Sequence, residues 1–363
     1  MTELLHTVKP NVRALQAYTL RPDRARIKLN QNENPWDAPA EIKRETLRRI
    51  NARAWSRYPD FVPDQFHQQL AEFVGWRPDG IIAGNGSNEM IQALLMVTVG
   101  PGKRVLISEP TFLLYRQITT VLAGETVSVP LTTELTYDLD ALRGQIQSTD
   151  PDVVIICSPN NPTGCVIEQA ELASLLEMTR GLVVVDEAYF EFSAQTVVPL
   201  LRQYSNLVVL HTFSKAMGMA GLRIGYLLGA PELVREIAKA ILPGNLNVIS
   251  RTAAEVAIEF YSTELKPRIE LIIRERDRLF RGLKQIPGLA PIPSQANFIA
   301  VRSAIEPPCV LEALLRRDIL IRDVSKYPML KDYFRVTVGT PEENDELLAA
   351  LRDVFIEHRA VAR

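Results

Sequence analysis

The chain has 363 residues, of which 47% are hydrophobic and 23% charged, an ordinary composition for a soluble protein with a sizeable core. The length favours two packed domains over one. With 41 basic and 43 acidic residues the formal net charge is -2, and there is no basic block of the kind that nucleic-acid binding requires.

Targeting and redox features favour a cytoplasmic protein. Residues 1–13 lack an apolar run after a basic start, so we expect no signal peptide, and no apolar stretch approaches the length of a membrane span. Cys157, Cys165 and Cys309 show no metal-ligand spacing and cannot all pair within the chain, which fits a reducing compartment. The four histidines form no cluster, so we expect no metal site.

Short apolar runs in the middle of the chain predict strands buried on both faces. They are Arg104–Ile107, Val153–Cys157, Leu182–Asp186 and Asn206–Leu210. Segments with helical periodicity lie between them, for example Glu168–Thr179. Alternating strands and helices predict an α/β fold with a mostly parallel sheet and right-handed crossovers.

The pattern changes near residues 243–247. A charged helix candidate follows at Glu264–Leu283, and then short strands at Asn297–Val301 and Tyr333–Val338. We therefore expect a smaller α+β domain at residues 246–363 after a large domain at residues 31–245. Residues 1–30 are expected to form an N-terminal arm that packs on the small domain or on a dimer partner.

The first motif with chemical content is Gly84–Glu89 (GNGSNE), which leads into an apolar helix candidate. Backbone N–H groups at such a helix start, with Ser87 and Asn88, can bind a phosphate. An ordinary tight turn with a helix cap has the same appearance, so the motif is weak when taken alone.

Two further motifs follow predicted strands, at the sheet edge where α/β proteins bind ligands. In Ser158–Gly164 (SPNNPTG), two prolines fix a loop that can aim Asn161 into a site. Asp186, in the sequence DEAY, ends an apolar strand, and a buried carboxylate there needs a partner such as a protonated pyridine nitrogen. The alternative for Asp186 is a cap of the next helix.

The fourth motif, Thr212–Lys215 (TFSK), is followed by Arg223. A lysine whose pKa is lowered by burial and by neighbouring cations is nucleophilic toward an aldehyde. Thr212, Ser214 and Arg223 can bind a phosphate. A lone lysine in this place is more often a surface residue, but the four motifs together supply what pyridoxal phosphate needs from a protein.

The sequence resembles the class I/II, fold-type-I pyridoxal-phosphate aminotransferases, and within them the histidinol-phosphate branch. The resemblance runs through nearly the whole chain and rests on motifs that are specific in combination. They are LNQNENP (29–35), RYPD (57–60), SEPTFLLY (108–115), CSPNNPTG (157–164), VVDEAYFEF (184–192), TFSKAMGMAGLRIGY (212–226) and FRVTVGT (334–340).

The resemblance implies a role for each motif. Lys215 would bond to the cofactor and shuttle the proton, and Asp186 would bind the pyridine nitrogen. Asn161 and Tyr189 would bind the ring's 3-oxygen, and Phe112 would stack on the ring. The phosphate would be held by Ser87, Asn88, Thr212, Ser214 and Arg223, and by Tyr58 of the other subunit, which implies a homodimer with composite sites.

For the substrate, Arg335 matches an arginine that grips a carboxylate or phosphate, and Arg322 matches a second arginine near it. Tyr18 and Asn32 are candidate helpers. Tyr18 lies in a stretch that lacks the usual Tyr-x-x-Gly opening, and Trp36 stands where a small residue is frequent, which we interpret as packing.

The implied reaction is a ping-pong transamination, a step of histidine biosynthesis. It interconverts two pairs of compounds: L-histidinol phosphate plus 2-oxoglutarate, and imidazole-acetol phosphate plus L-glutamate. An aromatic-amino-acid aminotransferase and a threonine-phosphate decarboxylase on the same scaffold remain alternatives. A non-catalytic relative is disfavoured because Lys215 and Asp186 are both present.

Overall fold

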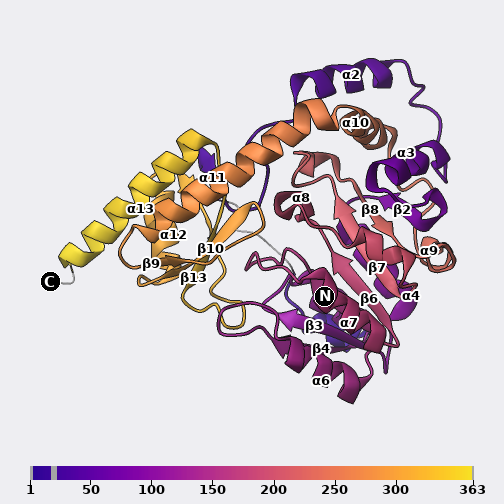
Figure 1. The fold of residues 1–363 in the computed structure, drawn as a ribbon, viewed down its shortest axis with the longest axis horizontal. Helices are drawn as coiled ribbons and strands as arrows, with labels where there is room; N and C mark the ends of the chain where they lie inside the picture. Colours follow the sequence, from indigo (N-terminus) through magenta and orange to yellow (C-terminus); the bar gives the residue numbers. More distant parts are fainter. Residues whose placement is uncertain (1–2, 18–22, 362–363) are drawn as a thin grey trace.

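A seven-stranded sheet forms the centre of the computed structural model, which describes residues 3–17 and 23–361 (Figure 1). Its strands, in spatial order, are β2 (Ile81–Gly84), β8 (Gly225–Leu228), β7 (Leu207–Thr212), β6 (Leu182–Asp186), β5 (Val153–Cys157), β3 (Arg104–Glu109) and β4 (Glu125–Pro130). The strands from β7 to β4 are parallel, and β8 is antiparallel to both of its neighbours. The predicted α/β class with a mostly parallel sheet is confirmed.

Apolar clusters cover both faces of this sheet. Side chains alternate along each buried strand, so these strands contribute to both clusters. Val183 and Val185 of β6 belong to one apolar cluster, and Val184 belongs to the cluster on the other side. The first cluster includes residues of α2 (Ala40–Asn51), α3 (Asp64–Val74), α6 (Leu139–Thr149), α7 (Gln169–Met178) and α10 (Val248–Glu259). The second includes residues of α4 (Ser87–Thr98), α5 (Leu114–Val121) and α9 (Pro231–Ala238).

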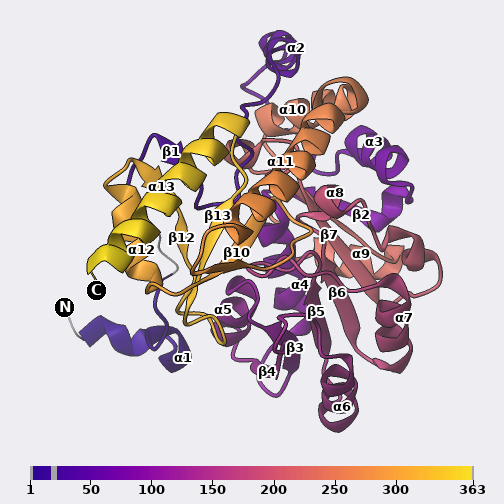
Figure 2. The same cartoon turned by 60° about the vertical axis from the view of Figure 1, so that its left-hand side comes forward.

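A second, antiparallel sheet lies beside the first and has its own core (Figures 1 and 2). Its strands, in spatial order, are β12 (Arg322–Asp323), β13 (Tyr333–Thr337), β10 (Phe298–Ser303) and β9 (Leu289–Pro291). Its helices are α11 (Lys266–Lys284), α12 (Pro307–Leu315) and α13 (Pro341–Val361). Strand β1 (Ile27–Lys28) pairs in parallel with β11 (Ile319–Leu320), so the start of the chain contacts this smaller unit.

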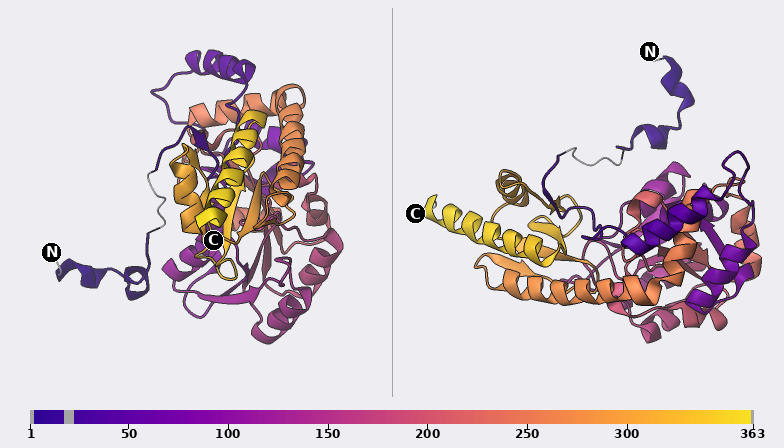
Figure 3. Two further views of the ribbon diagram at one scale, coloured as in Figure 1. Left: turned by 90° about the vertical axis from the view of Figure 1, so that its left-hand side faces the viewer. Right: turned by 90° about the horizontal axis from the view of Figure 1, so that it is seen from above.

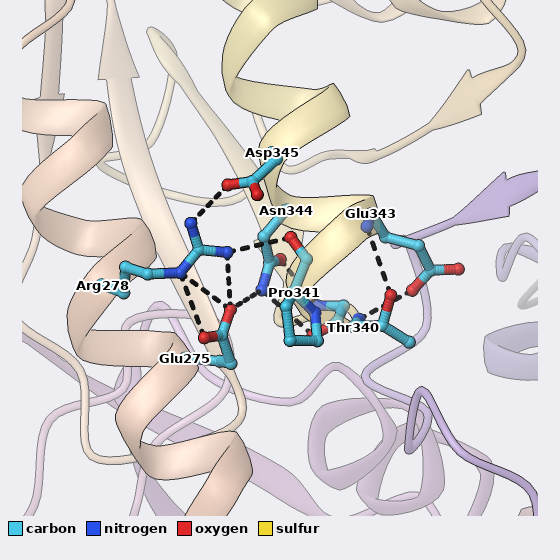
Figure 4. Close-up of polar contacts among 8 residues, drawn as sticks. Glu275, Arg278, Thr340, Pro341, Glu343, Asn344 and Asp345 are labelled. Atoms are coloured by element: carbon cyan, nitrogen blue, oxygen red, sulfur yellow. Dashed lines mark hydrogen bonds and ion pairs between the residues drawn. The ribbon is translucent and has the colours of Figure 1, made fainter.

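A buried polar cluster joins α11 to the segment that follows β13 (Figure 4). Asn344 is fully buried; its Oδ1 accepts the N–H of Gly339 at 2.9 Å, and its Nδ2 donates to Glu275 at 2.9 Å. Arg278 donates to the carbonyl of Pro341 at 2.9 Å. These bonds fix where the chain leaves β13.

The remaining elements are short: η1 (Glu3–Thr7), α1 (Pro10–Arg13), η2 (Pro78–Gly80), α8 (Phe190–Ser193), η3 (Val198–Arg202), η4 (Ala220–Leu222) and the π-helix η5 (Tyr261–Leu265). The first two project from the body of the protein (Figure 3), and Asn11 donates to the carbonyl of Thr120 on α5. Among the described residues, no helix is long and apolar enough to cross a bilayer.

Several predicted boundaries are wrong by one or two residues; for example, β3 extends to Glu109, and β10 runs from Phe298 to Ser303. The helix expected at Glu264–Leu283 begins with the π-turn η5, and α11 starts at Lys266. The strand expected to end at Leu210 continues to Thr212, because His211 is buried with hydrogen-bond partners on both ring nitrogens, Glu187 at 2.7 Å and Tyr226 at 3.0 Å. A satisfied polar side chain does not end a buried strand.

Candidate active site

The carboxyl ends of β5, β6 and β7 meet at one edge of the large sheet, where Cys157 and Asp186 are register partners. A cavity of about 450 Å³ opens there. The predicted site residues that line it are Asn32, Ser87, Asn88, Phe112, Asn161, Asp186, Tyr189, Thr212, Ser214, Lys215, Arg223, Arg322 and Arg335. Residues from both sheets therefore converge on a single space.

The amine of Lys215 lies inside this cavity, and its Nζ donates to the carbonyl of Gln31 at 3.0 Å. Burial lowers the pKa of Lys215 to about 8, and the positive charges of Arg335 and Arg223 act in the same direction. A sizeable fraction of the amine is therefore neutral near physiological pH, as a nucleophile or a base must be.

Asp186 ends β6 with its carboxylate buried. Its Oδ2 accepts the hydroxyl of Tyr115 at 2.6 Å, and its Oδ1 accepts the N–H of Ala188 at 3.1 Å. Burial raises the pKa of Asp186, while these two hydrogen bonds lower it. Phe112, one turn before Tyr115, packs edge-on against the Tyr115 ring at 5.6 Å between centroids.

The residues that could hold a phosphate lie where Arg223 approaches Gly86, at the N-terminus of α4. Arg223 Nη1 donates to Ser214 Oγ at 3.2 Å, and Thr212 Oγ1 donates to the same oxygen at 3.0 Å. Gly86 has a positive φ of 84°, and a Cβ there would come within 2.6 Å of the Arg223 guanidinium. Glycine therefore allows the cation to approach the backbone N–H groups at the helix start.

The far side of the cavity is built from Tyr189, Asn32 and Asn161. Asn32 Nδ2 donates to the hydroxyl of Tyr189 at 3.0 Å, and both residues are buried. Asn161 Oδ1 accepts a hydrogen bond from Arg335 Nη1, which leaves the amide Nδ2 as the donor that this side chain can offer to a ligand.

Two arginines, Arg322 and Arg335, lie side by side on the small sheet and line the cavity. Arg322 on β12 and Arg335 on β13 are direct partners in the antiparallel register, so their side chains share one face of the sheet. Arg335 is 6% exposed, donates to the carbonyl of Asn30 at 3.0 Å and lies over the ring of Phe298 at 5.1 Å. A pair of guanidiniums in a partly buried site fits a dianion.

Comparison with known proteins places this site in a family, because the model for aminotransferase class I and II matches residues 24–351. The chain belongs to the class I and II aminotransferases. Enzymes of this family depend on pyridoxal phosphate.

Individual relatives agree over nearly their whole length. A histidinol-phosphate aminotransferase of Chlorobium phaeobacteroides is 40% identical over 355 residues, which are 96% of this chain and 97% of that protein. One from Chlorobium phaeovibrioides is 36% identical over 351 residues, with 96% and 97% covered. The crystal structure of the Sinorhizobium meliloti histidinol-phosphate aminotransferase with pyridoxal-5'-phosphate has a TM-score of 0.86 at 24% identity, covers 96% and 97% of the two chains, and shows the same fold.

The cavity of this aminotransferase fits the cofactor group by group. A carboxylate that burial destabilises, Asp186, suits a protonated ring nitrogen, and the Gly86 turn beside Arg223 suits a phosphate. Lys215 supplies an amine with a lowered pKa for the aldehyde. Asp186, Arg223 and Lys215 all line one cavity.

Of the predicted residues that the structure describes, Tyr58 is not brought into the cavity. Tyr58 is 89% exposed and does not line the cavity of its own chain. Tyr18 lies outside the described residues. Trp36 is half-buried and packs against the cluster that holds Tyr189 and Ala216.

Three other residues of the aminotransferase site were not singled out from the sequence. Tyr115 binds Asp186, Tyr327 lines the cavity, and the carbonyl of Gln31 accepts from Lys215. For Tyr115 a signal exists, since it stands three residues after Phe112 at a helix start and so lies on the same side as Phe112. Backbone carbonyls such as that of Gln31 carry no sequence signal.

Proposed function

We propose that this protein is a histidinol-phosphate aminotransferase. It transfers the amino group of L-glutamate to the cofactor, releases 2-oxoglutarate, and then passes the amino group to imidazole-acetol phosphate to give L-histidinol phosphate. The observation that carries this proposal is the register pair Arg322–Arg335 beside Lys215 in one cavity. The names of the relatives that are 33 to 40% identical over most of the chain support it.

The two arginines have a recognition role in this proposal. Pyridoxal phosphate supplies an aldehyde that takes up the amino group and a ring that withdraws electrons from the reacting carbon. Arg335 and Arg322 bind the phosphate of one substrate and the distal carboxylate of the other, so one pocket serves both half-reactions. Because both substrates place their charge on the same arginines, the amine of each is held at a similar distance from Lys215.

The remaining polar residues bind and orient the reactants. Asp186 would stabilise the protonated ring nitrogen of the cofactor, and Tyr115 favours the ionised form of Asp186 by donating a hydrogen bond to it. Asn161 and Tyr189 hydrogen-bond the ring oxygen. The neutral amine of Lys215 would act as the base that takes the proton from the substrate carbon and later returns it, and this role requires a base whose pKa lies near the working pH.

The active protein is a homodimer in this proposal, and each cavity is completed by the partner subunit. The support is an exposed group of large side chains on the loop of residues 52–63, with Trp55 71%, Tyr58 89%, Phe61 65% and Val62 63% exposed. Such a group of aromatic and aliphatic side chains is typical of a protein interface. Tyr58 then reaches the cofactor phosphate of the other subunit.

The domain limits and the location in the cell are also proposals. The large sheet uses residues 81–228 and the small sheet residues 289–337, which supports domains at 31–245 and 246–363 with an arm at 1–30. Helix α10 falls in the proposed small domain by sequence, whereas its residues Ala254 and Val256 belong to the core of the large sheet. The three free cysteines fit the cytoplasm.

The test is a half-reaction screen with the cofactor-loaded enzyme. Histidinol phosphate, phenylalanine, glutamate and threonine phosphate are added separately, and the absorbance of the bound cofactor reports amino-group transfer. Fast transfer from histidinol phosphate and glutamate, with phenylalanine much slower, is expected. Equal or faster transfer from phenylalanine would make the enzyme an aromatic aminotransferase, and release of carbon dioxide from threonine phosphate would make it a decarboxylase.

A further inference from the structure

Three ion pairs connect α10 to the α2 region, outside the cavity described above. Helix α2 lies alongside α10 (Figures 1 and 2). Arg251, Glu255 and Glu259 stand four residues apart and therefore share one face of α10. Their partners are Asp60 at 2.9 Å, Arg53 at 3.2 Å and Arg49 at 2.6 Å.

Two of these ion pairs lie at the ends of one loop. Residues 52–63 connect α2 to α3, and Arg53 and Asp60 stand near its start and its finish. Both are tied to neighbouring turns of α10, through Glu255 and Arg251, which also lie 3.4 Å from each other. Tyr58 is carried between the two anchors and extends outward with 89% of its area exposed.

The α10 residues of these ion pairs, Arg251 and Glu255, are largely buried. The side chain of Arg251 is 11% exposed and that of Glu255 is 16% exposed, whereas that of Asp60 is 73% exposed. Ion pairs with one buried partner are screened less than fully exposed pairs and cost more to break. Within one subunit the aromatic side chains of the loop, Trp55, Tyr58 and Phe61, are mostly exposed, so apolar packing inside that subunit fixes the loop only weakly.

We propose that Arg251 and Asp60 are positioning residues: their ion pair holds the loop of residues 52–63 so that Tyr58 reaches the cofactor phosphate of the partner subunit. This rests on the proposed function, in which Tyr58 acts across the dimer. Neither Arg251 nor Asp60 lines the cavity of its own chain. The proposed effect of the pair on the reaction therefore passes through the position of Tyr58.

The experiment is a double-mutant cycle on the affinity of the full-length apo-dimer for pyridoxal phosphate, followed by absorbance titration. Tyr58→Phe is expected to weaken binding about tenfold, since it removes one hydrogen bond to a charged phosphate. Asp60→Asn and Arg251→Met are each expected to weaken it about fivefold, and Asp60→Glu to retain most of the affinity. In the Tyr58→Phe background, Asp60→Asn is expected to add less than about a twofold loss, because coupled residues are not additive.

The matched control is Arg317→Met, which breaks an ion pair with Glu357 at 2.7 Å on α13, far along the chain from the loop. It is expected to leave cofactor affinity unchanged, and the urea midpoint of every variant is measured alongside. Full additivity of Asp60→Asn with Tyr58→Phe, or unchanged affinity in both Asp60→Asn and Arg251→Met, overturns the positioning role. An unchanged affinity in Tyr58→Phe itself overturns the composite site of the proposed function, and the ion-pair proposal with it.

Discussion

The hydroxyl of Tyr115 donates a 2.6 Å hydrogen bond to Oδ2 of Asp186, and both residues lie almost wholly out of contact with water. Tyr115 belongs to α5 and Asp186 to the end of β6, so this bond ties a helix on one face of the sheet to the end of a central strand. Burial raises the pKa of Asp186, and Tyr115 is the strongest influence that lowers it. The charge of Asp186 is thus favoured by Tyr115, a residue of the motif SEPTFLLY (108–115) to which the sequence analysis assigned no role.

Tyr115→Phe is expected to weaken cofactor binding by about 1.5–3 kcal/mol, the usual contribution of a hydrogen bond to a charged group. The pKa of Asp186 rises further when the donor is lost, and a carboxylate gives up its charge as the pH falls through its pKa. The variant should therefore lose the cofactor at a higher pH than the parent during acidification. Dissociation constants measured across a pH series check this, and identical curves for the two proteins would contradict it.

The pH dependence of cofactor capture is set by Lys215. Burial lowers its pKa to about 8, so the neutral, reactive amine predominates above that pH and is protonated below it. The rate at which the apo-protein incorporates the aldehyde should rise with pH and level off above about 8. Stopped-flow absorbance measures it; a rate still climbing steeply toward the ordinary lysine pKa of 10.5 would mean that the amine is not in this environment.

Replacing Lys215 by Ala should abolish turnover while cofactor and substrate still bind together, because binding does not need the amine. A loss on the order of 10³-fold or more is expected when a group that both bonds to the cofactor and moves the proton is removed. Steady-state transaminase assays, with mass spectrometry to exclude wild-type contamination, check the result. Turnover within tenfold of the parent would remove Lys215 from its role.

Arg335→Met should weaken phosphate-bearing substrates by about 2–5 kcal/mol, since a dianion in a partly buried pocket loses its main partner. Phenylalanine carries no second anionic group and should be affected less. The pKa of Lys215 should also rise, because the charge of Arg335 lowers it. Half-reaction rates for both donors test the first expectation, and an unchanged apparent affinity for histidinol phosphate would show that another group reads the phosphate.

Asn344 stabilises the fold and does not line the cavity. Its side chain is fully buried and bonds Gly339 twice and Glu275 once (Figure 4). Asn344→Ala leaves these buried groups without a partner and should lower the free energy of unfolding by about 2–4 kcal/mol. Urea denaturation measures the change, with the exposed neighbour Asp345→Ala as the control; equal midpoints for the two variants would refute the assignment.

The sequence alone predicted four of the seven strands of the large sheet and the residue types at their ends. Val153–Cys157 and Leu182–Asp186 have the predicted bounds because an uninterrupted apolar run followed by a polar motif describes a strand buried on both faces. The cofactor residues follow from the same logic. Parallel strands end at one edge, so Asn161, Asp186 and Lys215 were expected at the same edge of the sheet. The adjacency of β5, β6 and β7, which the sequence does not give, brings them close together.

The tertiary structure decided what depends on distant partners. The placement of β2 beside β8, the extension of β7 through His211 and the bond from Tyr115 to Asp186 each join segments that nothing in the local pattern pairs. The pairing of Arg322 with Arg335 arises only from the β12–β13 register. Local composition fixes how a residue bonds to its own segment. Contacts between segments depend on how the whole chain packs, and a short stretch of sequence carries no information about those contacts.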